Sequence, residues 1–442
     1  MTRHIQIKRG LNIPLEGKAS GRLEVITPKM VGLVPDDFEG HKWKCPVKEG
    51  DEVGVGYPVL VNKDRSAINI VSPIAGIIKE IRRGERRKIL AVVIEAADIK
   101  ADKIEYDLSL DADSIRETLQ KSGIWALMRQ RPFDIVPDPD SEARDVFVTA
   151  FDSSPLAPVL FDNSNIAYAE KGIQILKILT GKAPYIATSQ NNSYEFKGAE
   201  NLVVDGPHPA GNVGVQIAAV SPVNKGETVW TMDISTLIRI GVLYTDGEPS
   251  WKTRVALTGP EMPDPHYVET IVGIDIHQLL PSSLDDKKGL RIISGNVLTG
   301  KKVNPTSDFL RYPYRQITVI EEGDDADEFM GWASLKPTKY STKRTFPAFI
   351  RGLAKPFPFD ARIKGGKRAM ILSGEFDKVF PFDIYPEYLL RAINNNDIDR
   401  MEKLGIYEVA PEDFALPEFV DTSKHELQQM VRSALDNLRQ EE

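Results

Sequence analysis

The chain has 442 residues, of which 41% are hydrophobic and 27% are charged. This is an ordinary composition for a soluble globular protein, but the chain is too long for one hydrophobic core. The net charge of -8 argues against a nucleic-acid partner, and the longest apolar runs, such as Leu90 to Ile94, fall far short of the ~20 residues of a membrane span.

The N-terminal segment gives mainly negative information. Its first ten residues, MTRHIQIKRG, lack the apolar core of a secretory signal, which favours a cytoplasmic protein. Cys45 is the only cysteine, so an intrachain disulfide and a cysteine-held iron–sulfur cluster are excluded. The six histidines are scattered without an HExxH motif, and we expect no protein-held metal.

Two glycine-punctuated strand patterns follow, Val47 to Leu60 and Ser72 to Ile81. Together they resemble the barrel-sandwich hybrid of biotinyl and lipoyl carriers. Lys63 lies near the place of the carriers' modified lysine, but the flanking pattern is missing, so we interpret Lys63 as a solvated turn residue. We expect Gly50 and Gly76 to hold tight turns. A continuous apolar strand from residue 88 to residue 96 closes this domain.

The next pattern is a helix from Asp113 to Ser122, followed by the loop Ser122–Pro137, SGIWALMRQRPFDIVP. A loop that holds a flavin or dinucleotide phosphate needs several glycines, but this loop contains only Gly123. Bulky and cationic residues take their place: Trp125, Met128, Arg129, Arg131, Pro132 and Phe133. The loop therefore predicts a cofactor-binding architecture whose cofactor site is filled. The alternative is that its Trp and Phe are simply core residues.

The residues after this loop alternate between strand and helix patterns. Strands are predicted at residues 145–151, 185–188 and 202–205, with helices at residues 166–180 and near 233–241. This order predicts a Rossmann-like three-layer α/β domain with a mostly parallel sheet.

The motif Asp205–Gly214, DGPHPAGNVG, follows the last of these strands. Pro207 and Pro209 remove two backbone donors that phosphate binding would use, so we predict a rigid turn with His208 exposed. His208 could titrate or donate to a ligand oxygen; alternatively it is structural or solvated.

The last third begins with short strands at residues 255–260, 267–274 and 290–294 around one helical turn, which favours a β-grasp module. The C-terminal part is mostly helical and ends in a helix at residues 422–441, with Ser423 and Glu426 as a capping box. The predicted domains are 1–100 (barrel-sandwich hybrid with an N-terminal arm), 101–252 (α/β), 253–322 (SLBB-type β-grasp) and 323–442 (helical).

A series of motifs spans nearly the whole chain: GIWALMRQRPFDIVP, VTAFDSSPLAP, VVDGPHPAG, VALTGPEM, RIISGNVLTG, GWA and PFDIYPEYLLRAI. In this order they resemble the NqrA family, which belongs to the sodium-translocating NADH:quinone reductase. This family is itself similar to the flavin-bearing subunits of complex I and the Rnf complex, whose G-G-A-x-F-P-T loop holds FMN. Here the bulky loop stands at the aligned position.

The resemblance implies a cofactor-free peripheral subunit on the cytoplasmic side of the bacterial inner membrane. Its partners would be subunits B to F, and NADH, FAD, FMN, riboflavin and an iron–sulfur cluster would be used by those subunits, with ubiquinone or menaquinone as the substrate. Family members commonly carry a C-terminal cysteine pair in a segment like C-x-F-V-C-P. This chain has Leu416–Asp421, LPEFVD, instead, and no redox or metal role is assigned to it.

The resemblance and the loop chemistry together give candidate residues for quinone, although none is called catalytic. The flat rings of Trp125 and Phe133 could stack on a quinone ring, and Arg129, Arg131 or His208 could donate to its carbonyl oxygens. The competing account is that the rings plug an old flavin cavity and that Arg131 faces a partner protein of the complex. Two other functions stay open: an autonomous flavin-dependent NADH oxidoreductase, and a small-molecule-binding β-grasp module.

Overall fold

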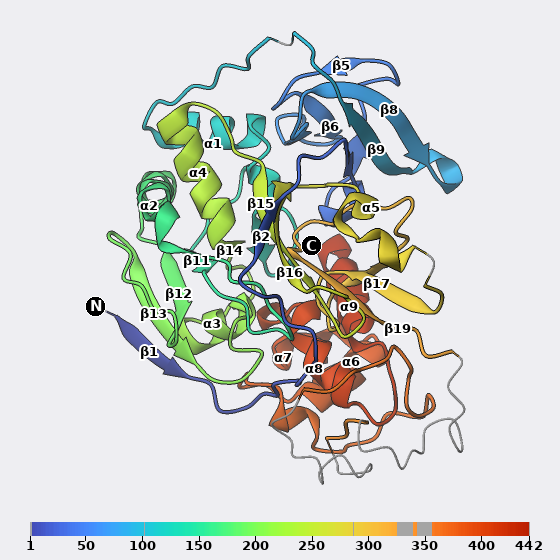
Figure 1. Cartoon of the computed structure of the whole chain (residues 1–442). Coiled ribbons are helices and arrows are strands. Elements are labelled where there is room, and N and C mark those ends of the chain that lie inside the picture. Colours follow the sequence, from blue (N-terminus) through green and yellow to red (C-terminus); the bar gives the residue numbers. More distant parts are fainter. Residues whose placement is uncertain (1, 101, 286, 325–338, 343–355, 442) are drawn as a thin grey trace.

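The computed structural model describes residues 2–100, 102–285, 287–324, 339–342 and 356–441. Within these ranges the chain forms a barrel-sandwich hybrid, an α/β domain, a β-grasp domain and a helical C-terminal region (Figure 1). The GWA motif, residues 331–333, lies outside the described residues.

The barrel-sandwich hybrid consists of two small antiparallel sheets, ordered β3-β9-β8-β5 and β4-β6-β7. Its strands are β3 (Met30–Leu33), β4 (Trp43–Lys44), β5 (Glu52–Val53), β6 (Pro58–Asn62), β7 (Asn69–Val71), β8 (Gly76–Arg83) and β9 (Ile89–Ala96). Lys63 is exposed in the turn between β6 and β7, as expected from the sequence. Gly50 has φ = +90°, a conformation that glycine adopts without strain.

The α/β domain is built on a six-stranded sheet ordered β1-β13-β12-β11-β14-β10, in which only β10 is antiparallel. The strands are β1 (Arg3–Gln6), β10 (Arg129–Arg131), β11 (Asp145–Thr149), β12 (Tyr185–Ser189), β13 (Glu200–Asp205) and β14 (Val229–Asp233). The helices are α1 (Ala112–Lys121), α2 (Ile166–Thr180), α3 (Val213–Val220) and α4 (Ile234–Asp246). The mostly parallel sheet confirms the predicted fold class.

Side chains of β11 alternate between the two faces of this sheet. Val146 and Val148 pack in the same core as α2 and α4, whereas Phe147 packs with α3 and the C-terminal helices. Helices therefore cover both faces, which is the three-layer arrangement. The sequence patterns located α1, α2 and α4 but missed α3 and β14. Both are short, and Gln216 is the one polar residue of α3, so the helix shows no helical period of polar and apolar positions.

The N-terminal arm, residues 2–29, extends over the other domains before it enters the barrel-sandwich hybrid. Its strand β1 adds to the α/β sheet beside β13, and β2 (Leu23–Val25) adds to the β-grasp sheet beside β16. Neither pairing is visible in the sequence, because both strands are only three or four residues long and mostly exposed.

The β-grasp domain has the strand order β18-β17-β19-β15-β16-β2. Its own elements are β15 (Lys252–Thr258), β16 (His266–Ile271), α5 (Ile276–Leu279), β17 (Leu290–Ser294), β18 (Lys301–Val303) and β19 (Gln316–Glu321). The sequence patterns predicted β15, β16, β17 and the helical turn.

The C-terminal region contains α6 (Pro386–Asn394), α7 (Ile398–Lys403), α8 (Ala415–Val420) and α9 (Leu427–Glu441). The predicted apolar face of α9 is buried. The predicted capping box is wrong: the helix begins at Leu427, the Ser423 hydroxyl donates to the carbonyl of Ala369, and Glu426 pairs with Lys367. Ser423 therefore anchors an upstream segment instead of capping α9.

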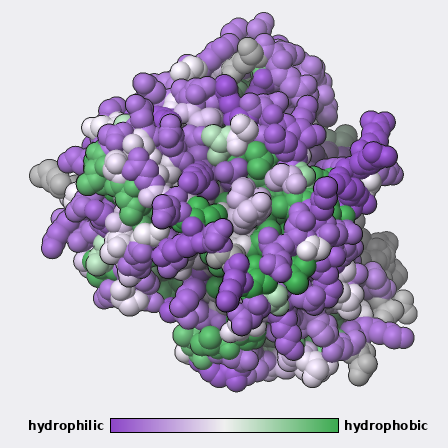
Figure 2. Space-filling model, turned by 90° about the horizontal axis from the view of Figure 1, so that it is seen from above, coloured by the Kyte–Doolittle hydropathy of each residue, from purple (hydrophilic) through white to green (hydrophobic). Residues whose placement is uncertain are grey.

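The surface seen from above in Figure 2 is mostly hydrophilic, with hydrophobic side chains in several small groups. Among the described residues, no helix has both the length and the apolar character that crossing a membrane requires.

Candidate functional site: a crevice between the α/β and β-grasp domains

A crevice lies at the carboxyl ends of β11 and β14, between the α/β domain, the β-grasp domain and the C-terminal region. Strands β12 and β13 are added on one side of β11, whereas the next strand of the sheet, β14, lies on its other side, so the order of the connections reverses between β11 and β14. Thr149 and Asp233, the last residues of these two parallel strands, are register partners. In open α/β sheets this reversal is where ligands bind.

Two adjoining hollows, of about 210 and about 420 Å³, form what we call the switch-point crevice. Residues that line both are Thr149, Val213, Asp233, Thr299, Pro313, Tyr314 and Glu412.

Asp233 and Arg315 join the two domains across this crevice. Asp233 caps α4 by accepting a hydrogen bond of 2.8 Å from the amide of Thr236. The Arg315 guanidinium, from the β-grasp domain, donates to the Asp233 carboxylate and to the hydroxyl of Ser235. Burial alone would raise the pKa of Asp233, but Arg315 and the Thr236 amide outweigh it, and the pKa lies below its ordinary value. The guanidinium of Arg315 therefore occupies the end of the switch point.

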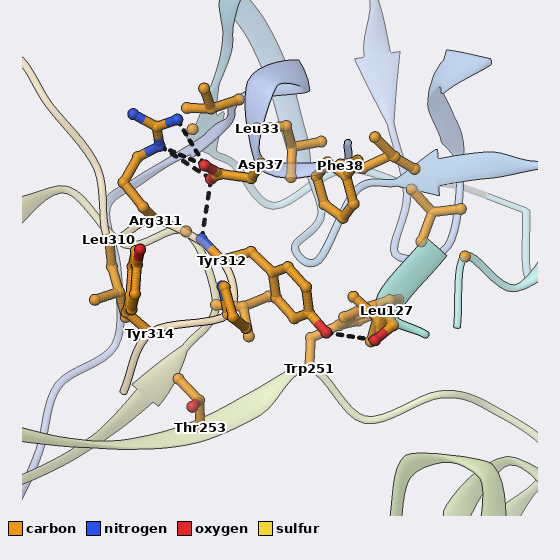
Figure 3. A pocket seen from close by; sticks show the side chains of 18 of the residues that line it. Leu33, Asp37, Phe38, Leu127, Trp251, Thr253, Leu310, Arg311, Tyr312 and Tyr314 are labelled. Atoms are coloured by element: carbon orange, nitrogen blue, oxygen red, sulfur yellow. Dashed lines mark hydrogen bonds and ion pairs between the residues drawn. The ribbon is translucent and has the colours of Figure 1, made fainter. Parts of the chain in front are cut away.

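The residues just before Arg315 hold the β-grasp domain against the other two domains (Figure 3). The carboxylate of Asp37, in the barrel-sandwich hybrid, accepts from the Arg311 side chain at 2.8 Å and from the Tyr312 amide at 2.9 Å. The Tyr312 hydroxyl donates to the carbonyl of Leu127 at 2.6 Å, and its ring stacks on Phe38 with centroids 5.4 Å apart. The cavity beside these rings measures about 60 Å³, well below the range of ligand pockets.

Carboxylates outnumber cations in the lining of the larger hollow, although Asp37 and Asp233 are paired with Arg311 and Arg315. The described ionisable residues that line its larger hollow are the carboxylates of Asp36, Asp37, Glu39, Asp134, Asp233 and Glu412 and the cations Arg129, Lys301 and Arg432. The first turn of α3 also lies next to a carboxylate, because a β-carbon placed on Gly214 would be 2.7 Å from both carboxylate oxygens of Asp413. Helix N-termini commonly bind phosphate, and here the side chain of Asp413 lies beside the N-terminus of α3.

The first predicted site residue, Trp125, lies in the hydrophobic core and lines neither hollow of the crevice. Its ring is fully buried, its indole N–H donates to the carbonyl of Pro137 at 2.9 Å, and it packs edge-on against Trp230 with centroids 5.1 Å apart. Arg116 lies over both rings. Phe133 is also buried and packs edge-on against Tyr407 of the C-terminal region.

Arg131 is buried among three carboxylates. Its guanidinium lies 2.9 Å from Glu412, 3.3 Å from Asp413 and 3.6 Å from Asp134. Burial raises the pKa of Glu412 to about 8 against the opposing effect of Arg131, and it also raises the pKa of Asp413. The Arg131 guanidinium is nearly fully buried, whereas Glu412 and Asp134 remain partly exposed, so the cluster extends from the core to the crevice.

The other two predicted residues, Arg129 and His208, each line one of the two hollows. Arg129 lines the larger hollow, with its guanidinium over the Tyr312 ring and a 2.8 Å hydrogen bond to the carbonyl of Asp37. His208 lines the smaller hollow, with its Nδ1 3.0 Å from the hydroxyl of Ser153.

The prediction that His208 is exposed was wrong. The ring is 4% exposed, because the N-terminal arm covers the turn: the amide of Leu11 donates to the His208 carbonyl at 2.8 Å, and Asn12 accepts from the His208 amide at 2.8 Å. Burial lowers the pKa of His208 to about 4, so the ring is neutral at pH 7.

Sequence reasoning missed Thr149, Asp233, Tyr314, Arg315 and Glu412. One signal could have found Asp233: an aspartate between a β-branched apolar run and a helix is typical of a strand end that also caps a helix. The rest come from distant parts of the chain, and nothing in the sequence places them together.

Three family models match the chain: the NqrA N-terminal barrel-sandwich hybrid domain at residues 5–97, the NqrA second alpha/beta domain at 110–249, and the NQRA C-terminal domain at 254–304. Full-length relatives agree with them. The A subunit of the Na(+)-translocating NADH-quinone reductase of Neisseria meningitidis (strain Z2491) is 33% identical over 99% of this chain and 100% of its own length. The chain belongs to the NqrA family. The same protein of Hahella chejuensis is 34% identical and that of Pasteurella multocida 33% identical, with the same coverage.

Membership of the NqrA family agrees with the resemblance seen in the motifs, and the matched family models confirm the barrel-sandwich, α/β and C-terminal SLBB domains. Among solved structures, the crystal structure of NAD+-reducing [NiFe]-hydrogenase in the air-oxidized state matches 74% of this chain and 61% of its own, with a TM-score of 0.36 and 10% identity. A likeness this low carries no argument.

Proposed function

We propose that this chain is the peripheral NqrA component of a Na+-translocating NADH-quinone reductase, on the cytoplasmic side of the membrane, and that it binds no flavin, nicotinamide or iron–sulfur cofactor itself. The observation that carries this is the Arg315–Asp233 ion pair, which occupies the end of the switch point. Electrons would then pass from NADH to quinone through cofactors held by subunits B to F: FAD, FMN, riboflavin and an iron–sulfur cluster.

Electrostatics supports the absence of a phosphate-bearing cofactor. FMN, FAD and NADH all carry phosphate, which would meet the carboxylates of the larger hollow, such as Asp36 and Glu39, and the Asp413 side chain beside the first turn of α3. Isothermal titration of the purified chain should find no micromolar binding of FMN, FAD or NADH. Micromolar binding of any of them, or a yellow flavin absorbance after purification, would favour the flavin-dependent oxidoreductase instead.

We further propose that quinone binds in the switch-point crevice. A quinone is neutral, so the carboxylates of the lining do not repel it. Arg129 lines the larger hollow and His208 the smaller one, and each could donate to a carbonyl oxygen. Trp125 and Phe133 are buried and would hold the loop in place instead of stacking on the quinone. Arg131 would act through Glu412, which lines both hollows.

A photoreactive quinone, crosslinked to the purified complex and mapped by mass spectrometry, tests this placement without mutation. The label should fall on crevice peptides of this chain. Arg129→Gln should reduce labelling, whereas Lys63→Gln, which removes a cation from an exposed turn of the barrel-sandwich hybrid, should leave it unchanged. Labelling confined to other subunits would contradict a quinone site in this chain. In a separate experiment, failure of the chain to co-purify with other subunits would favour the small-molecule-binding module.

A further inference from the structure

The C-terminal region exposes four large apolar side chains, Ile371, Leu372, Tyr385 and Tyr388, which we call the C-terminal patch. Their exposed fractions are 56%, 48%, 70% and 54%. Large apolar side chains that gather on a surface mark an interaction site more often than single ones do.

Hydrogen bonds link the two halves of the C-terminal patch. The backbone amides of Ser373 and Gly374 donate to one carboxylate oxygen of Glu387, at 2.8 and 2.9 Å. Glu387 directly precedes Tyr388 in α6, so the chain after Leu372 is tied to the helix turn that carries both tyrosines. The two tyrosine rings lie edge to face, 6.1 Å apart.

The segment that carries the aliphatic half of the patch is basic. Residues 360–374 contain four cations, Arg362, Lys364, Lys367 and Arg368, and one carboxylate, Asp360, in a chain whose net charge is -8. Asp360 pairs with Arg362 and Lys364, and Lys367 makes an exposed pair with Glu426, which is weak in water. Lys367 and Arg368 are exposed and come just before Ile371. The C-terminal patch therefore lies beside a local positive charge on an otherwise acidic molecule.

This combination fits an anionic lipid surface better than a protein surface. Lysine is depleted at protein–protein interfaces, whereas cations beside exposed aliphatic and aromatic residues are the signature of binding to anionic headgroups. Tyrosine in particular places its ring in the headgroup zone and its hydroxyl in water. The acidic remainder of the chain would be repelled by the same surface, which orients the molecule. In Figure 1, α6 lies at the end of the molecule remote from β5 and β8 of the barrel-sandwich hybrid.

We propose that the C-terminal patch and the adjacent cations Lys367 and Arg368 dock this chain directly on anionic phospholipid headgroups of the membrane. The inference rests on the proposed function, because it assumes that the chain works beside a membrane. Leu372, Tyr385 and Tyr388 would enter the interfacial layer, while the cations contact phosphates. The chain would thus have a lipid contact of its own in addition to its contacts with other subunits.

The test is vesicle flotation with the purified full-length chain. Vesicles of phosphatidylglycerol and phosphatidylcholine in equal parts should bind the chain at low salt, vesicles of phosphatidylcholine alone should bind it weakly, and about 1 M salt should reduce binding. The double variant Arg368→Glu/Leu372→Ser should weaken partitioning at least tenfold, since each cation near the surface is worth about fivefold. The matched control Lys177→Glu/Ile178→Ser alters an exposed cation and an exposed apolar residue on α2 and should bind like the original chain.

Three results would overturn the proposal. One is absence of binding to the anionic vesicles. The second is equal loss of binding in the control. The third is a patch variant that binds vesicles normally but no longer assembles with the other subunits, which would make the patch a protein contact. Circular dichroism that matches the original chain establishes that the variants are folded, and Tyr388→Ser provides a second variant if they are not. The proposed function is tested separately, by co-purification and quinone labelling.

Discussion

Arg315 of the β-grasp domain donates to the carboxylate of Asp233, which caps α4 in the α/β domain. Side chains 82 residues apart in sequence thus close the end of the switch point, and each is mostly buried there. Removing only one partner of such a buried ion pair destabilises the fold, because the remaining buried charge is left without a partner.

Arg315→Gln should therefore destabilise the fold by about 3–5 kcal/mol, as measured by urea unfolding at pH 7. The pKa of Asp233 is depressed in the folded chain, so its stabilising contribution is present above its ordinary pKa and is lost as pH falls through the folded value. Without Arg315 the pKa of Asp233 moves upward, so the loss of stability on acidification that Asp233 causes should be smaller in Arg315→Gln than in the original chain. Lys79→Gln, which breaks an exposed pair with Glu95, should change stability by less than about 1 kcal/mol. Equal effects of the two substitutions would contradict the role given to Arg315.

His208 should make the chain less stable in mild acid. Its folded pKa is about 4 because of burial, while an unfolded histidine titrates near 6.5. Between these values the unfolded chain binds the extra proton, so the free energy of unfolding should fall as pH drops from about 6.5 to about 4, by at most about 3 kcal/mol. His208→Gln should flatten this part of the urea-unfolding profile relative to the original chain, and His277→Gln, at an exposed position, should not. An unchanged slope in His208→Gln would show that the ring is not buried neutral.

At Phe133, glycine should be tolerated at least as well as alanine, because the backbone has φ = +77°. Phe133→Ala removes a buried ring and should cost about 3–5 kcal/mol. Phe133→Gly removes the same ring but relieves a left-handed conformation that costs other residues about 1–2 kcal/mol, so it should be no less stable than the alanine variant. At Phe147, buried in β11 with ordinary strand geometry, the order should be reversed, with glycine less stable than alanine. Calorimetry on the four variants decides between these orders.

Gly50 and Gly76 should differ in their tolerance of alanine. At Gly50 an added β-carbon meets no atom within 4 Å, and the strain comes from φ alone, so Gly50→Ala should cost about 1 kcal/mol. At Gly76 the added carbon would lie 2.1 Å from the carbonyl oxygen of Glu95, so Gly76→Ala must move β8 from β9 and should cost more than Gly50→Ala. Gly21→Ala, with open space and no positive φ, is the control that should be nearly neutral. Thermal unfolding of the three variants measures the order, and intact-mass spectrometry should find Lys63 unmodified.

The sequence alone determined the elements that carry a strong local signal. The helix at residues 166–180 was predicted to the residue, because its apolar positions recur at helical spacing and Gly181 ends it with φ = +71°. That the loop Ser122–Pro137 holds no phosphate-bearing cofactor stays a prediction, which depends only on which residues are present. The barrel-sandwich and β-grasp domains followed from strand patterns and glycine turns.

Only the tertiary structure decided where the site lies and what surrounds each side chain. His208 was predicted exposed, and residues of the N-terminal arm, about 200 positions away in the chain, bury it. Asp233, Arg315 and Glu412 meet at one crevice although 179 residues separate the first from the last. Local propensity acts over a few residues, whereas burial, ion pairing and pKa depend on groups brought together by long-range packing. For that reason the sequence could show that the loop is poor in glycine, while the crevice became visible only in the folded chain.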